Sequence, residues 1–244
     1  MDTTMSAPTT DGLRVKIARY WFGGIAVVVA IALIIQLILT FTGGQDANTG
    51  QSTGHLPLGT ALIRLFRFFT IQSNIFVLAT SIALFLNVRR DGKVWRVLRF
   101  DALLGIIITG LVFETILAPL AFSYMKGWAV VATIGFHYIS PWATLIGWLL
   151  FGPRPRTTWT TTLWAFVWPL LWLVYTFVHG AITGWYPYPF LDVATIGFAD
   201  SVRNSAFVLV IGIVIAVVIT LLDHHLPSLV RDRRTSAARA SADA

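Results

Sequence analysis

Residues 66–74 read FRFFTIQSN and begin a long apolar run that nevertheless carries several polar side chains. A helix completes a turn about every 3.6 residues, so Arg67, Thr70 and Asn74 are expected on one face. Ser81 follows further along the same face. Polar groups on a membrane helix need polar partners. This stretch therefore predicts a membrane helix whose polar stripe is completed by side chains from other helices.

Composition places the chain in a membrane. Of its 244 residues, 56% are hydrophobic and only 12% are charged, and its mean hydropathy is +0.74. Soluble proteins average about 25% charged residues, so the solvent for this chain is expected to be a lipid bilayer. The sequence contains no cysteine, which excludes disulfides, thiolate nucleophiles and cysteine-ligated metals.

Six apolar runs predict an all-α polytopic bundle of six transmembrane helices. The first run is too long for the apolar core of a typical signal peptide, so it is interpreted as a span. One domain is expected over residues 14–225, between a disordered N-terminal tail (1–13) and a disordered basic C-terminal tail (226–244). The spans are expected at residues 20–41, 65–87, 100–119, 130–151, 160–182 and 204–222.

The basic residues predict how the bundle is oriented. Six spans place both termini on one side, and that side collects fourteen Lys and Arg residues against four on the other. By the positive-inside rule, both termini are expected in the cytoplasm and the protein in the cell membrane. Because the net charge of +7 arises in these short loops and tails, nucleic-acid binding is not expected.

Polar side chains in five of the spans are predicted at a similar depth. At about 1.5 Å per helical residue, they are expected roughly 5–10 Å below the outer face of a ~30 Å core. The inner halves of the spans are expected to be almost purely apolar. A polar pocket is therefore expected near the outer leaflet, covered by the loop WYPYPFLD. The side chains concerned are Thr70, Glu114, His137, His179, Arg203 and Asn204.

Several of these residues also have simpler explanations. Arg67 could extend along its helix to reach lipid head groups, and a lone Ser or Thr in a span often only bonds a backbone carbonyl. His179 lies close enough to the surface to be an ordinary interfacial residue, as do the aromatic residues of the outer loop. Glu114 and His137 are ionisable and well inside the core, so they favour a functional role.

Without cysteine, a hydroxyl is the available nucleophile, and it needs a base within hydrogen-bond reach. Thr70 or Ser73 could attack an ester carbonyl while His137 takes the hydroxyl proton and returns it to the leaving alcohol. Glu114 could orient the imidazole, as the third member of a triad does. The supporting roles are assigned to Asn74 or Asn204 as oxyanion donors and to Arg67 or Arg203 as partners of a substrate carboxylate.

Other functional classes remain alternatives to an esterase. Two histidines and a glutamate could hold a metal ion, but no HExxH or similar spacing supports this, so no metal and no other cofactor is expected. A small transporter would need polar groups along its whole path, which the apolar inner halves argue against. A non-catalytic protein could hold an amphiphile in the same pocket. In each case the expected partners are membrane lipids or an amphiphilic ester.

Three motifs carry a resemblance to a known family. The loop VHGAITGWYPYPFLD (178–192) closely resembles the corresponding loop of the androgen-induced integral-membrane protein family. FFTIQSN (68–74) and HYISP (137–141) resemble its bacterial branch, the Pr6Pr family membrane proteins. The resemblance covers about residues 20–222 and implies six transmembrane helices. For the animal members it also implies hydrolysis of fatty-acid esters of hydroxy fatty acids by a membrane-embedded threonine and a histidine.

Carried onto this sequence, the family's threonine falls on Thr70 and its histidine on His137. The spacing departs from the animal members in two places. Thr70 to Asn74 is one residue longer, and His137 to Pro141 is one residue shorter. Each alignment needs a shift of one residue, so Ser73 remains a rival nucleophile. The bacterial branch need not share the substrate of the animal members.

Overall fold

The computed structural model describes residues 10–230, and this part of the chain is helical throughout apart from its connecting loops. Within that range, six helical runs are long and apolar enough to cross a membrane. The described residues form no strand beyond an isolated bridge between Gln45 and Ser52. The predicted all-α fold with six spans is therefore confirmed.

Three of the six runs are single helices, and three are built from shorter segments. The single helices are α1 (Thr10–Phe41), α3 (Phe69–Leu86) and α11 (Phe198–His225). Two short elements, η3 (Pro189–Leu191) and α10 (Val193–Ile196), lie between the fifth and sixth runs. Helix α2 (Leu58–Arg67) directly precedes α3. The remaining segments are α4 (Lys93–Val112), η1 (Phe113–Leu117), α5 (Ala118–Tyr124), α6 (Trp128–Ile134), η2 (Gly135–Ile139), α7 (Ser140–Phe151), α8 (Trp159–Ala165) and α9 (Val167–Thr183).

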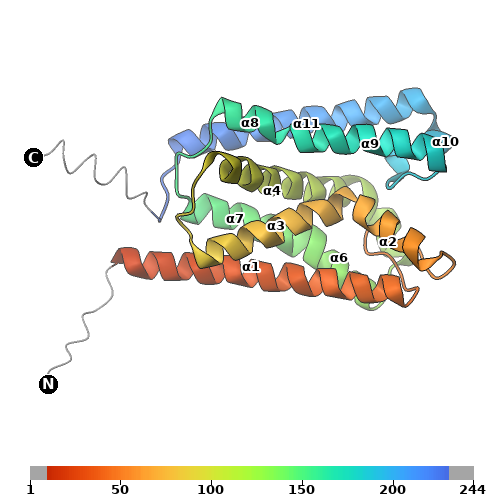
Figure 1. Cartoon of the computed structure of the whole chain (residues 1–244), viewed down its shortest axis with the longest axis horizontal. Coiled ribbons are helices and arrows are strands. Elements are labelled where there is room, and N and C mark those ends of the chain that lie inside the picture. Colours follow the sequence, from red (N-terminus) through yellow and green to blue (C-terminus); the bar gives the residue numbers. More distant parts are fainter. Residues whose placement is uncertain (1–9, 231–244) are drawn as a thin grey trace, which may run out of the picture.

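The start of α1 and the end of α11 lie at the same end of the bundle, as an even number of spans requires (Figure 1). The connection from α1 to α2 and the segment with α10 lie at the opposite end (Figure 1). We call these the terminal end and the loop end of the bundle. All candidate site residues from the sequence can be located relative to these two ends.

Each predicted tail includes residues that belong to the helical bundle in the structure. Residues 10–13, expected in the N-terminal tail, form the first turn of α1. Residues 226–230, expected in the C-terminal tail, pack against the terminal end: the amide of Leu229 donates to the carbonyl of Leu150 (2.9 Å), and Val230 is fully buried. The rest of both predicted tails lies outside the described residues.

The second span is not the continuous helix that the sequence predicts. Helix α2 ends at Arg67 and α3 begins at Phe69, because Phe68 between them is extended (φ −64°, ψ 128°). The ring of Phe68 is buried and packs edge-on against Trp185 and Tyr188, with centroid distances of 5.8 and 5.6 Å. The expected polar stripe is therefore divided, with Arg67 on α2 and Thr70 on α3.

The break at Phe68 leaves main-chain polar groups that side chains satisfy. Gln72 donates to the carbonyl of Phe66 (3.0 Å), and the indole of Trp172 donates to the carbonyl of Arg67 (3.0 Å). The amides at the start of α3 point toward Tyr188 instead. An unpaired main-chain group at membrane depth costs several kcal/mol, so these partners are what permit the break.

Helix α3 packs between α1 and α4 in the middle of the bundle. Helix α9 lies at its edge, and its buried residues are Thr176 and Gly180. An aromatic contact attaches α9 to α3: Trp168 stacks on Phe69 with a centroid distance of 4.6 Å. The outward side of α9 is apolar and exposed, which suits a surface in contact with lipid.

The terminal half of the bundle is less apolar than the sequence suggests. Asp101 of α4 is only 4% exposed, and its Oδ1 atom has no hydrogen-bond partner among the described residues. Asp223 at the end of α11 is also buried, and its carboxylate accepts from the amides of Arg156 and Thr157, each at 2.6 Å. The expectation of almost purely apolar inner halves is therefore wrong at Asp101, an ionisable residue within a span.

The close approach of three helices at Gly105 gives a stability prediction. A Cβ atom at this position would lie 2.9 Å from the ring of Trp168 and 3.0 Å from Ser73 Oγ. Gly105→Ala should therefore overpack the core and destabilise the protein by about 1–3 kcal/mol. Gly24 of α1 is the matched control, because a Cβ there meets nothing within 4 Å, and Gly24→Ala should gain up to ~1 kcal/mol of helix propensity.

Thermal unfolding in detergent measures both variants. The melting temperature should fall for Gly105→Ala and stay level or rise for Gly24→Ala. Equal melting temperatures for the two variants would show that the contact at Gly105 is not tight.

Candidate active site

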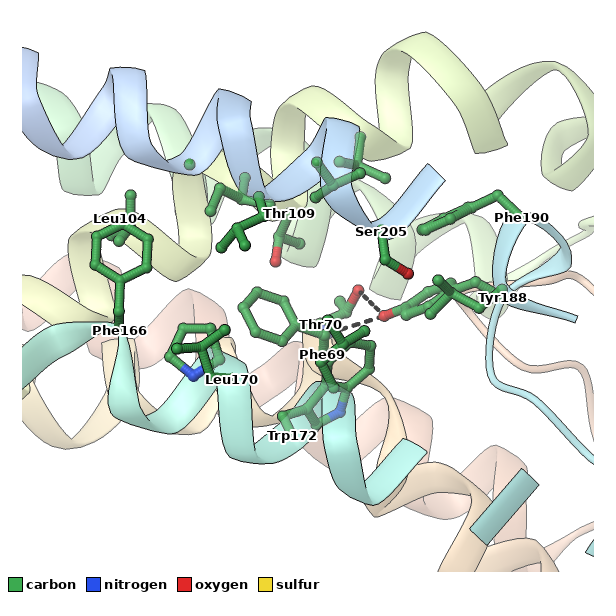
Figure 2. Close-up of a pocket in the computed structure, with 18 of the residues that line it drawn as sticks. Phe69, Thr70, Leu104, Thr109, Phe166, Leu170, Trp172, Tyr188, Phe190 and Ser205 are labelled. Atoms are coloured by element: carbon green, nitrogen blue, oxygen red, sulfur yellow. Dashed lines mark hydrogen bonds between the residues drawn. The ribbon is translucent and has the colours of Figure 1, made fainter. Parts of the chain in front are cut away.

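Thr70 is the second residue of α3 and lies directly behind the break at Phe68. Its side chain is 3% exposed. The hydroxyl oxygen lies 3.4 Å from His137 Nε2 and 3.2 Å from the hydroxyl of Tyr188; Figure 2 shows the contact with Tyr188. The structure thus brings together the hydroxyl and the imidazole that the sequence paired across two spans. A contact of 3.4 Å is longer than the 2.6–3.2 Å typical of a nucleophile and its base, as is common without substrate.

His137 projects from η2, a π-helical segment in the middle of the fourth span. Its ring is 1% exposed and stacks on Phe113 of a second π-helical segment, η1, with a centroid distance of 3.8 Å and an interplanar angle of 19°. A π-helical turn adds a residue to the normal helical repeat, and such turns are frequent at functional sites. Here the His137 ring of η2 stacks on a ring of η1, so the two π-helical segments meet at the imidazole.

The partners of His137 define its tautomer. Nδ1 lies 3.2 Å from the main-chain carbonyl of Thr133, and a carbonyl can only accept a hydrogen bond. In the neutral ring the proton is therefore on Nδ1, which leaves the lone pair of Nε2 directed at the hydroxyl of Thr70. The side chain of Thr133 is itself fixed, because it donates to the carbonyl of Ala47 (2.6 Å).

Tyr188 completes the site, although the sequence placed it only in the covering loop. Its hydroxyl accepts from the amide of Thr70 (3.2 Å) and also interacts with the amide of Phe69. Burial raises the pKa of Tyr188 to about 12, so the hydroxyl keeps its proton at neutral pH. It can therefore donate to Thr70 Oγ1. In the sequence, Tyr188 lies between two prolines of WYPYPFLD. This loop has no helical periodicity, so the sequence alone did not indicate where the Tyr188 side chain points.

The oxyanion role expected for Asn74 is not supported by its contacts. Its side-chain amide donates to the carbonyls of Thr70 (2.9 Å) and Phe136 (3.5 Å). It therefore holds η2 against α3 rather than facing the hydroxyl. The donors nearest to Thr70 Oγ1 are the amide of Thr70 and the hydroxyl of Tyr188. An amide at a helix N-terminus also carries the positive end of the helix dipole.

Ser73 and Glu114 lie away from the imidazole. Ser73 is fully buried and faces α4 at Gly105, and its hydroxyl has no partner among the described residues. Glu114 is exposed, and its carboxylate accepts from the hydroxyl of Tyr138 (2.5 Å). The expected contact between Glu114 and His137 is replaced by the carbonyl of Thr133. The cause is the π-helical geometry of η1 and η2, which changes which residues share a face.

Of the remaining predicted residues, Arg67 and Asn204 contact the loop that carries Tyr188. Asn204 donates to the carbonyl of Phe190 (3.1 Å) and so fixes η3 rather than an oxyanion. His179 contacts Thr183 within α9. Arg203 is largely exposed and pairs with Asp200 (2.9 Å). Neither His179 nor Arg203 approaches Thr70.

Arg67 is buried, with 5% of its surface exposed. Its guanidinium lies over the rings of Trp185 (5.0 Å) and Tyr175 (5.5 Å), and its Nη2 atom has no hydrogen-bond partner among residues 10–230. Arg64 lies over the same indole, at 4.9 Å. Two guanidinium groups therefore share one aromatic ring at the loop end, an arrangement that favours an anion. Arg67 does not extend to the surface as a simple snorkelling residue would.

An apolar chamber adjoins Thr70 on one side. Its walls come from α3, α4, α9, α11 and the η3 segment, and Figure 2 shows Thr70 and Tyr188 toward one end and Leu104 and Phe166 at the other. The chamber has a volume of about 90 Å³. The hydroxyl of Thr109 lines it without a hydrogen-bond partner in the described part of the chain. Otherwise the walls are mainly aliphatic and aromatic.

A polar vestibule lies on the other side of Tyr188. It has a volume of about 260 Å³ and is formed by the loop after α1, by α2 and by the loop after α9. Asp46 and Arg64 are among its charged residues. Burial raises the pKa of Asp46, whereas hydrogen bonds from Asn48 and Thr49 oppose that shift. Tyr188 lines both spaces, so Thr70 lies between an apolar and a polar compartment.

The candidate metal ligands do not gather. His137, His179 and Glu114 each have other contacts, as described above. Within residues 10–230, no group of three or more His, Cys, Asp or Glu side chains is arranged to hold a metal ion.

Comparison of the chain with protein-family models, with curated proteins and with solved structures gives no match. Function therefore has to be argued from the geometry of the site itself.

Proposed function

We propose that the protein is an intramembrane hydrolase of lipid esters, with Thr70 as nucleophile and His137 as general base. The observation that supports this most strongly is the position of Thr70 Oγ1, 3.4 Å from the unprotonated nitrogen of a buried imidazole. The hydroxyl also lies at the end of an apolar chamber. A hydroxyl with a base in reach and a space for an acyl group is the arrangement that acyl transfer needs.

In the first half of the reaction, the Thr70 oxygen attacks the ester carbonyl while its proton passes to His137 Nε2. The tetrahedral intermediate then collapses, and the C–O bond to the alcohol breaks. The imidazolium returns the proton to the leaving alkoxide, which departs as an alcohol. Thr70 is left as an acyl ester.

In the second half, His137 takes a proton from water, and the resulting hydroxide attacks the acyl carbon. The bond between that carbon and the Thr70 oxygen breaks, and the threonine recovers its proton from the imidazolium. A carboxylic acid is released. The polar vestibule beside Tyr188 is a route by which this water can arrive.

The negative charge of the intermediate needs hydrogen-bond donors. The amide of Thr70 and the hydroxyl of Tyr188 lie beside the nucleophile and meet each other at 3.2 Å. A carbonyl oxygen that enters between them would receive both hydrogen bonds. Such preorganised donors often make the largest single contribution to acyl transfer.

The surroundings of the site favour a single-chain amphiphile as substrate. One side of Thr70 is apolar and the other is polar, and the guanidinium groups of Arg64 and Arg67 suit an anionic end group. A fatty-acid ester of a hydroxy fatty acid, which the resemblance of residues 68–74 and 178–192 implies for the family's animal members, has both features. Membrane lipids are thus the proposed source of substrate.

The proposed location is the cell membrane, with both termini in the cytoplasm. The excess of Lys and Arg in the loops at the terminal end supports this orientation. A cysteine introduced into the vestibule, Thr53→Cys, should react with an impermeant maleimide added to intact cells, and Ser228→Cys should react only after lysis. The reverse pattern would place the candidate site on the cytoplasmic face. The native chain contains no cysteine, so the background is low.

Two substitutions test the catalytic pair directly. Thr70→Ala should abolish hydrolysis of a fatty-acid ester in detergent and covalent labelling by a fluorophosphonate. His137→Ala should lower the hydrolysis rate by about 10²–10⁴-fold. Ser73→Ala and Glu114→Gln are the controls, because neither side chain contacts the imidazole, and both should retain near-normal rates.

The outcomes separate the alternatives. Labelling that disappears in Ser73→Ala but persists in Thr70→Ala would move the nucleophile to Ser73. A wild-type protein that binds the ester without hydrolysing it would instead indicate a non-catalytic lipid-binding protein.

Tyr188→Phe tests the oxyanion donor. The phenyl ring keeps the packing against Phe68 and Phe190 and removes only the hydroxyl. The value of kcat should fall by about 10²-fold with little change in KM, as for loss of one oxyanion donor. Tyr138→Phe is the matched control, because the Tyr138 hydroxyl bonds Glu114 outside the site. Equal kcat values for the two variants would exclude this role for Tyr188.

A further inference from the structure

The chamber beside Thr70 has a defined direction and a defined end. On α11 its wall runs from Ser205 to Gly212, which is about 10 Å of helix at about 1.5 Å per residue. Thr70 and Tyr188 lie toward the Ser205 end, and Leu104 and Phe166 lie at the far end (Figure 2). A chain that starts at Thr70 and follows the wall of α11 therefore extends toward the middle of the bundle.

Gly212 is exceptional within α11. It lies in the sequence FVLVIGIVIAVV, where a glycine costs about 1 kcal/mol of helix stability relative to alanine. It is buried and lines the chamber. A Cβ atom at this position would lie 3.2 Å from Ile108 Cδ1 and 3.9 Å from Phe166. The missing side chain thus keeps the far end of the chamber open.

The walls of the chamber reach the outer surface of the bundle. Leu170 of α9 lines the chamber and is also 42% exposed. The indole contacts of Trp168 and Trp172 tie α9 to α2 and α3, and α11 forms the opposite wall. An acyl chain that enters from the bilayer would pass between α9 and α11, because residues of both helices line the chamber.

We propose that the chamber is an acyl-chain site that takes a straight chain of about eight carbons, measured from the ester carbonyl and stopped at Gly212. This inference rests on the proposed function, because the carbonyl is placed at Thr70.

The length of the chamber sets the expected chain length. A fully extended chain advances about 3.6 Å over three backbone bonds, or about 1.2 Å per bond, so about 10 Å accommodates roughly eight bonds.

The test compares rates for butanoyl, octanoyl and hexadecanoyl esters of the same alcohol. Wild-type protein should prefer the octanoyl ester. Gly212→Leu should lower the ratio of octanoyl to butanoyl rates about fifteenfold, which corresponds to two methylenes excluded from the chamber. Gly212→Ala is the milder variant, and its ratio should fall about fourfold for one methylene. Gly24→Leu on the exposed face of α1 is the matched control, and its ratio should equal that of wild type.

A second measurement does not depend on hydrolysis. Octanoic acid with a terminal diazirine is photolysed with the purified wild-type protein, and the cross-linked peptides are identified by mass spectrometry. Cross-links are expected around Leu104, Phe166 and Gly212, and they should disappear in Gly212→Leu.

The outcomes distinguish failure of this inference from failure of the proposed function. An active wild-type protein whose chain-length ratio is unchanged in both Gly212 variants would overturn the acyl site and leave the hydrolase proposal standing. An inactive wild-type protein would overturn the hydrolase proposal, and the cross-links would then be the only test of the acyl site. Cross-links in the chamber would support the acyl site, and cross-links confined to outward faces of the helices would overturn it.

Discussion

The interruption of the second span at Phe68 is the constraint on which the candidate site depends. In an unbroken helix the amide of Thr70 would donate to the carbonyl of Phe66. Because the chain is extended at Phe68, that amide is free to meet Tyr188, and the carbonyl of Phe66 is satisfied by Gln72. The membrane makes this break costly unless every released group finds a partner. The side chains that satisfy the break therefore also build the surroundings of Thr70.

The same break explains how far the sequence could predict the site. Hydropathy indicated six spans because a span needs only length and composition. Depth along each span paired Thr70 with His137, since one added residue changes the depth along a span by no more than about 1.5 Å. Rotation about the helix axis is more sensitive, because one added residue in η1 or η2 changes which side chains face inward. That is why the roles expected for Asn74 and Glu114 do not match their contacts. Tyr188 lies in a loop, where no helical periodicity exists to predict that its side chain is buried in the core.

Tyr188 contacts Thr70 and also lies between the apolar chamber and the polar vestibule. The apolar chamber and the polar vestibule meet at its ring, and its hydroxyl is the polar tip of an otherwise aromatic contact with Phe68 and Phe190. The proposed hydrolysis of a lipid ester requires an acyl chain and a water molecule to meet at the same carbon. A residue that is apolar along its length and polar at its end suits that boundary.

The partner of His137 also fits a site within a membrane. A soluble triad orients its imidazole with a carboxylate, which remains ionised throughout the reaction. A carboxylate buried at this depth would carry a large desolvation cost unless it were fully paired. The carbonyl of Thr133 supplies the same hydrogen bond and the same tautomer with no net charge. In the proposed reaction, charges arise only transiently, as the imidazolium and the oxyanion, and they form next to each other. The carboxylate of Glu114 lies outside the site, where it is exposed and accepts from Tyr138.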